Sequence, residues 1–136
     1  MKSRSLSRVF RTIAMLFSIV LLGALAPRAF AHARLLKSTP AKGAEVATPT
    51  QIDLWFNELL EDGFNTISVY PSSELDSDKH SNLAEGKVII DAKDRTHLTV
   101  KLGKLAPGEY VVDWRVLSRD GHSAPGRITF TVKGAK

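Results

Sequence analysis

The sequence contains no cysteine, and its only two methionines, Met1 and Met15, lie near the amino terminus. Disulfides are therefore excluded, and the rest of the chain cannot build a thiolate or thioether site for Cu(I). Long hydrophobic runs are also scarce, because only one apolar run, Thr12 to Pro27, reaches 16 residues without a charge. A membrane-spanning helix needs roughly 20 apolar residues, so this run is short for a membrane anchor.

The apolar run instead forms the middle of a three-part secretory signal. Basic residues at positions 2, 4, 8 and 11 precede it without any acid, and the small-x-small triplet at 29–31, Ala-Phe-Ala, follows it. This order of basic, apolar and cleavage regions is typical of a signal peptide. We therefore expect residues 1–31 to be a cleaved signal peptide and residues 32–136 to be the exported protein.

Removal of the signal peptide changes the charge balance of the protein. The whole chain has 19 Lys and Arg against 14 Asp and Glu, but five of the basic residues lie within residues 1–31. The exported chain then carries 14 residues of each sign and is formally neutral. We expect no nucleic-acid partner, because such partners select a strongly basic surface. The remaining length suits one domain with an ordinary apolar core, and we expect a monomer.

Apolar residues alternate with polar ones along most of the exported chain, which predicts half-buried strands. The clearest are at 51–57, 65–70, 97–102, 109–116 and 127–132, with edge strands at 33–38 and 87–90. Pro71 to Glu85 is the longest predicted loop, and a helical period extends over no more than one turn, at Asn57 to Glu61. About seven short strands predict an all-β fold with a single Greek-key β-barrel or sandwich, cupredoxin-like or immunoglobulin-like.

Cleavage after residue 31 would make His32 the first residue of the exported protein. Its α-amine and imidazole could then close a chelate ring on one metal ion. Asp120 and His122 flank Gly121 just after a predicted strand, and residues two apart point to the same side of an extended chain. Three nitrogens and an oxygen form a tetragonal environment that suits Cu(II), although zinc also accepts imidazole.

Simpler interpretations of these residues are open at this point. An Asp-Gly-His turn is usually a solvated loop in which the aspartate caps a backbone N–H, and a histidine at a chain end is ordinarily frayed. His97 lies in an alternating strand and is predicted to be a solvent-facing or cross-strand residue. Trp114 shares the parity of Val112 and Val116, which places it in the core. The sequence alone does not bring His32 and His122 together.

Three blocks of the exported chain resemble the CopC family of periplasmic copper-resistance proteins. They are HARLLKSTPAKGAEV at 32–46, PTQIDLWFNELL at 49–60 and GEYVVDWRVLSRDGHSAPGRITFTV at 108–132. The resemblance implies a Greek-key β-barrel that binds Cu(II) in the periplasm and stores or delivers it. It implies His32, Asp120 and His122 as ligands, and it makes Glu58 a candidate axial or outer oxygen. It also implies an inner-membrane transporter of the CopD type as partner.

The resemblance has one departure. Some members of that family carry a methionine-rich loop that binds Cu(I), whereas the corresponding stretch here, residues 71–86, has no methionine. We therefore expect one Cu(II) site and no thioether Cu(I) site. We expect a copper carrier and no enzyme, since a carboxylate beside the histidines would hold Cu(II) rather than cycle it. The alternatives are a copper monooxygenase of the terminal-histidine type and a metal-free immunoglobulin-like interaction module.

Overall fold

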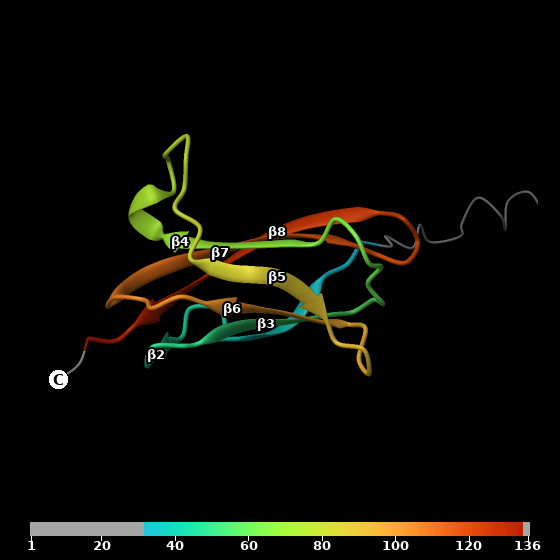
Figure 1. The fold of residues 1–136 in the computed structure, drawn as a ribbon, viewed down its shortest axis with the longest axis horizontal. Coiled ribbons are helices and arrows are strands. Elements are labelled where there is room, and N and C mark those ends of the chain that lie inside the picture. The colour runs from blue at the N-terminus through green and yellow to red at the C-terminus, as the bar shows by residue number, and fades with distance from the viewer. Residues whose placement is uncertain (1–31, 135–136) are drawn as a thin grey trace, which may run out of the picture. The chain divides into compact units, whose positions relative to one another are not determined.

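Alternating apolar side chains can be buried on one face of a strand only if a second layer covers that face, and this chain supplies the second layer as another sheet. The computed structural model describes residues 32–134, which fall in one compact unit. Eight strands in this range form two four-stranded sheets packed as a β-sandwich (Figure 1). The all-β prediction is confirmed.

The two sheets take their strands from alternating parts of the chain. One sheet has the order β1 (Leu35–Thr39), β3 (Gln51–Phe56), β6 (His97–Leu102) and β5 (Ala84–Ile90). The other has the order β2 (Glu45–Val46), β8 (Ser123–Val132), β7 (Gly108–Leu117) and β4 (Thr66–Pro71). The pairing is antiparallel throughout both sheets except between β2 and β8, which are parallel.

The core lies between the sheets and uses every second residue of the long strands. Phe56 on β3 and Trp114 on β7 meet edge to face with ring centroids 6.1 Å apart, so Trp114 is a core residue as predicted. Gly126 on β8 lies opposite Trp114, and a Cβ there would come within 2.2 Å of the indole ring. The glycine is therefore required by the packing of the tryptophan.

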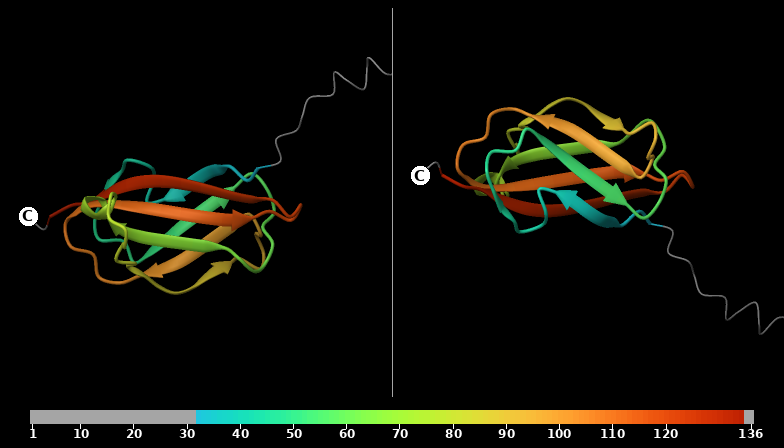
Figure 2. Two further views of the ribbon diagram at one scale, coloured as in Figure 1. Left: turned by 90° about the horizontal axis from the view of Figure 1, so that it is seen from above. Right: turned by 90° about the horizontal axis from the view of Figure 1, so that it is seen from below.

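The strand register brings three separate parts of the chain to one end of the sandwich. Leu35 pairs with Phe56, Thr66 pairs with Arg115, and Leu117 pairs with Ser123. The first described residues, the β3–β4 connection and the β7–β8 turn consequently lie at the same end, as both views of Figure 2 show. We call residues 32–34, 57–65 and 118–122 the ligand end, because they include the candidate ligands His32, Glu58, Asp120 and His122.

The structure differs from the sequence prediction in small elements. No helical turn forms at Asn57 to Glu61, where an isolated bridge joins Leu60 to Ser118 instead. The predicted long loop contains a short 3-10 helix, η1 (Ser72–Glu74), and β2 was not predicted, because two residues are too few to show alternation. Within residues 32–134 no helix has the length and apolar character needed to cross a membrane.

Candidate metal centre

The start of the described chain is held by the burial of one residue and by the backbone hydrogen bonds of the next. Ala33 is only 7% exposed and packs in the core. The next residue, Arg34, donates its N–H to Oδ1 of Asn57 at 2.5 Å, and its carbonyl accepts from the N–H of Asn57 at 3.1 Å. His32 therefore directly precedes two residues that packing and hydrogen bonds hold in place.

The β7–β8 turn presents Asp120 and His122 on a tight, internally bonded loop. Ser118 donates its N–H to the carbonyl of His122 at 2.9 Å and accepts from the N–H of Gly121 at 2.9 Å. Gly121 has φ +87°, a left-handed conformation that glycine adopts without strain. The two flanking side chains are thereby brought together, as the spacing predicted.

Asp120 directs both of its oxygens to His122. Oδ1 accepts the backbone N–H of His122 at 3.0 Å, and Oδ2 lies 3.0 Å from Nδ1 of the imidazole. The backbone N–H lowers the pKa of the Asp120 carboxyl most, followed by the His122 side chain and by the charges of His122 and His32. The carboxylate form is thus favoured, and it orients an imidazole that is 61% exposed.

His32 and His122 meet at the ligand end although 90 positions separate them in the sequence. Their ring centroids are 5.9 Å apart, and the ring planes make an angle of 57°. A site shared by the two histidines needs their side chains to lie close together, and the sequence alone could not establish this. Among residues 32–134, however, no group of three or more His, Asp and Glu side chains is arranged to hold a metal ion as it stands.

Glu58 lies on the segment that joins the two histidine-bearing parts. The segment pairs with Arg34 through Asn57, and on its other side the carbonyl of Leu59 accepts the N–H of Arg119 at 2.9 Å. The N–H of Glu61 also donates to the carbonyl of Leu117 at 2.9 Å. The backbone of Glu58 is therefore close to both parts, while its half-buried side chain makes no hydrogen bond or ion pair with His122 or Asp120.

The other two histidines of the described chain have different surroundings. His97 is cross-strand from Trp55, stacks on its ring at 4.4 Å with planes 5° apart, and bonds Oδ1 of Asp53 through Nε2 at 2.8 Å. His80 stacks on Tyr70 with centroids 4.1 Å apart. Each of these two imidazoles is therefore stacked on an aromatic side chain of a sheet.

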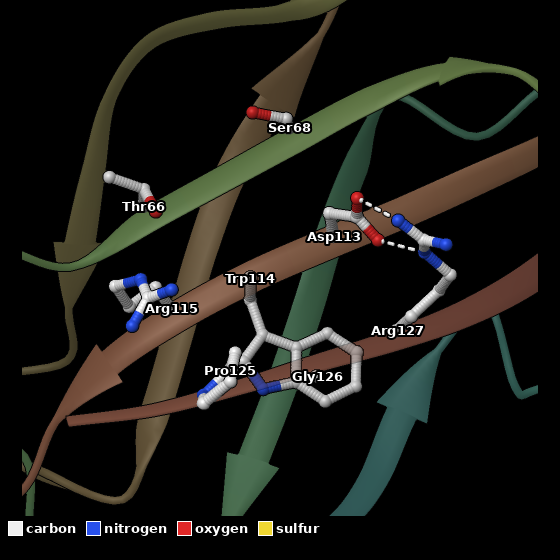
Figure 3. A pocket seen from close by; sticks show the side chains of 8 residues that line it. All are labelled: Thr66, Ser68, Asp113, Trp114, Arg115, Pro125, Gly126 and Arg127. Atoms are coloured by element: carbon white, nitrogen blue, oxygen red, sulfur yellow. Dashed lines mark hydrogen bonds and ion pairs between the residues drawn. The ribbon is translucent and has the colours of Figure 1, made fainter. Parts of the chain in front are cut away.

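A hollow of about 440 Å³ lies on the sheet that contains β4, β7 and β8. It is lined by Thr66, Ser68, Asp113, Trp114, Arg115, Pro125, Gly126 and Arg127, none of which was a predicted ligand (Figure 3). Arg127 donates hydrogen bonds to both carboxylate oxygens of Asp113 there, and this guanidinium lowers the pKa of the Asp113 carboxyl. None of its lining residues belongs to the ligand end.

Asn57 is the functional candidate that sequence reasoning missed. It follows the last residue of a strand, a position at which an asparagine ordinarily indicates a turn. Its partner, Arg34, lies 23 positions earlier, so no local pattern reveals the contact.

Comparison with known proteins places this architecture among copper proteins. Residues 35–133 match the CopC domain family. The copper transport protein CutJ of Bacillus subtilis is 40% identical over 108 residues, which is 76% of this chain but only 18% of the length of CutJ. The crystal structure of CopC from Methylosinus trichosporium OB3b is similar with TM-score 0.67 and 32% identity, over 77% of this chain and 97% of that one. The methionine-rich copper resistance protein PcoC of Escherichia coli has TM-score 0.61 and 34% identity, over 76% and 100%.

Proposed function

The chain belongs to the CopC domain family, and on that premise we propose that it is a periplasmic carrier of one Cu(II) ion. In this proposal the signal peptide is removed after residue 31. His32 then binds copper through its α-amine and Nδ1, and His122 supplies a third nitrogen. The cargo is captured, stored or handed on in copper homeostasis without being chemically transformed.

The observation that carries the proposal is the approach of the two imidazoles to 5.9 Å between centroids. Two imidazoles and one amine are neutral nitrogen donors, which favour Cu(II) among the common divalent ions. In the uncleaved chain the nitrogen of His32 is part of a peptide bond and cannot serve as an amine. Two histidines and Asp120 therefore form an incomplete set, which cleavage would complete.

Asp120 has two tasks in this proposal. Its contact with Nδ1 of His122 selects the tautomer in which Nε2 carries the lone pair, so that His122 binds through Nε2. Its negative charge also compensates the charge of the arriving ion, and one carboxylate oxygen can exchange its contact with His122 for the metal. Glu58 is proposed as an outer oxygen, because its segment lies beside both histidine-bearing parts.

The absence of sulfur restricts the oxidation state of the cargo. The exported chain has neither cysteine nor methionine, so it has no soft donor to prefer Cu(I). In this respect it differs from PcoC, which is named as methionine rich. We propose one Cu(II) site and no separate Cu(I) site. Reductive titration with Cu(I) that yields a tight second equivalent would contradict this.

Delivery to a membrane transporter of the CopD type is part of the proposal. The longer CutJ, named a copper transport protein, contains a segment similar to this chain within a much larger polypeptide. A segment similar to this chain thus occurs within a protein that is named for copper transport. We propose that the present chain acts as a monomeric partner of such a transporter rather than as an oxygen-activating enzyme. Copper-loaded protein should then consume no more oxygen with ascorbate than its H122A variant does.

Titration with Cu(II) of two matched proteins tests the proposal. One begins at His32, and the other carries a single additional alanine before His32, so that the amine is displaced by one residue. Loss of an outer-shell partner typically weakens metal sites by roughly 10–100-fold, and loss of a direct donor is expected to exceed the upper limit of about 100-fold. Equal affinities of the two proteins would reject the terminal chelate.

A further inference from the structure

Asn57 holds the segment that carries the first histidine with two hydrogen bonds. Its side-chain Oδ1 accepts from the N–H of Arg34 at 2.5 Å, and its backbone N–H donates to the carbonyl of Arg34 at 3.1 Å. The second bond is available to any residue except proline, but the first requires a side-chain acceptor of this length. It ties down the N–H of Arg34, two positions after His32.

Asn57 itself stands on a rigid base. Phe56, the residue before it, is 1% exposed and donates its N–H to the carbonyl of Thr96 at 2.9 Å. Side chains that hold a ligand in place are effective when their own positions are locked by packing. The backbone at Asn57 is therefore a fixed point from which the start of the exported chain can be positioned.

The segment that begins at Asn57 also forms hydrogen bonds with the β7–β8 turn and the end of β7, which precede His122. Leu59 accepts from Arg119 at 2.9 Å and Glu61 donates to Leu117 at 2.9 Å. Asn65, near the end of the same connection, accepts the N–H of Leu117 through Oδ1 at 2.8 Å. One connection, residues 57–65, thus braces both the strand β1 side and the β7–β8 turn of the ligand end.

We infer that Asn57 is a positioning residue for copper capture, acting through Arg34 on the placement of His32 relative to His122. The inference rests on the proposed function, because the placement matters only if both histidines bind one ion. Chain ends that are not tied down fray. A protein whose binding-competent state is populated for only a fraction of the time loses apparent affinity by that fraction.

The test compares N57A, N57D and N82A in the protein that begins at His32. N57A removes the acceptor, whereas N57D retains an oxygen at the same position. N82A is the matched control, since Oδ1 of Asn82 also accepts backbone N–H groups, from Val69 and Ala84, both at 3.1 Å, and none of these residues belongs to the ligand end. Cu(II) affinity is measured by competition titration, and the electron paramagnetic resonance spectrum reports the ligand field.

We expect N57A to bind Cu(II) about tenfold more weakly, which corresponds to a competent fraction of about one tenth. Its copper spectrum is expected to broaden or split into two species. N82A should keep the wild-type affinity and spectrum even if it unfolds at a lower temperature. N57D should restore the wild-type spectrum, and measurement at high salt removes the contribution of its added charge to affinity. An N57A protein with wild-type affinity and spectrum overturns the inference.

A copper-free measurement separates this inference from the proposed function. Exchange of the Arg34 amide hydrogen, followed by NMR in the apo protein, is expected to be slow in the wild type and in N82A and at least about tenfold faster in N57A. If the wild type binds no Cu(II) while this acceleration is seen, the proposed function fails and the clamp on the N-terminal segment stands. If the Arg34 amide exchanges equally in wild type and N57A, the positioning role is wrong whatever the copper result.

Discussion

The molecule contains two histidine and aspartate pairs of nearly equal length in very different surroundings. At the ligand end, Nδ1 of His122 lies 3.0 Å from Asp120, and the histidine side chain is 61% exposed. On the β3–β6 surface, Nε2 of His97 lies 2.8 Å from Asp53, and the histidine side chain is only 16% exposed. A short distance to a carboxylate therefore does not by itself separate the histidine that we propose as a ligand from one that packs within a sheet.

What separates the pairs is the availability of the second ring nitrogen. Nδ1 of His97 faces Asp91 at 3.7 Å while its ring is stacked on Trp55, so both nitrogens and one face are engaged. Of the two ring nitrogens of His122, only Nδ1 forms an ion pair with a carboxylate of residues 32–134. A second imidazole, that of His32, lies close to the ring of His122. The first arrangement joins strands within a sheet, and the second is the one that we propose for copper binding.

The largest effect that sharpens this comparison is the response of copper binding to pH. An α-amine ordinarily titrates near 7.7–8.0 and an imidazole near 6.5, and both must lose protons to bind a metal. Between pH 7.5 and 5.5 the Cu(II) affinity of the protein that begins at His32 is expected to fall by about 1,000-fold or more. Competition titration across this range measures the fall.

Asp120 is not the origin of that pH dependence. Its pKa is lowered in the folded protein, chiefly by the backbone N–H of His122, so it remains a carboxylate throughout this range. H97A should reproduce the wild-type pH profile of copper binding, because His97 belongs to the other pair. A profile that is flat from pH 7.5 to 5.5, or one that H97A abolishes, contradicts the assignment of the donors.

The next largest effect is expected from replacing each histidine in turn. H122A removes a direct donor and should weaken Cu(II) binding by more than about 100-fold while leaving the fold intact, since the side chain is exposed. H97A should leave copper affinity unchanged but lower the free energy of unfolding by about 1–3 kcal/mol, because Asp53 loses a buried hydrogen bond. Copper titration and denaturant unfolding of both variants measure these effects. The opposite distribution of losses would reverse the roles of the two pairs.

The two aspartates give a similar but smaller contrast. D120N retains the size of the side chain and loses the charge and one acceptor, so Cu(II) affinity is expected to fall roughly 10–100-fold. D53N should leave copper binding unaffected and should destabilise the fold, because a neutral amide replaces the carboxylate that bonds both Gln51 and His97. The same titration and unfolding measurements apply. Unchanged copper affinity and spectrum in D120N would remove Asp120 from the site.

The smallest effect is expected for Glu58. As an outer oxygen it contributes charge rather than a bond, and exposed charge interactions amount to about 1 kcal/mol at most. E58Q should therefore weaken Cu(II) binding by no more than about fivefold. E61Q, on the same segment, is the matched control for a change of charge. A loss in E58Q as large as that in H122A would show that Glu58 is a direct ligand.

Much of this fold could be predicted from the alternation of apolar residues, because each long strand buries one face. Trp114 was placed in the core by parity alone, and the structure confirms it. The strand at Glu45–Val46 could not be found, since it owes its place to the parallel partner β8 rather than to its own pattern. The helical turn at 57–61 was wrong because those residues pair with two other segments instead.

The candidate site divides in the same way. The local pair Asp120 and His122 follows from spacing and from a glycine that tolerates a positive φ. The approach of His32 to His122 depends on the register of β1 on β3 and of β7 on β8, which no local pattern encodes. Asn57 was invisible for the same reason, because its partner is distant in sequence.

The central claim is that the amine and imidazole of His32 and the imidazole of His122 bind one Cu(II) ion together. Electron paramagnetic resonance of the protein that begins at His32, loaded with one equivalent of Cu(II), tests it most directly through the nitrogen superhyperfine pattern. The account predicts the pattern of three coordinated nitrogens, reduced to two in H122A and unchanged in H97A. A pattern that is identical in wild type and H122A would contradict it.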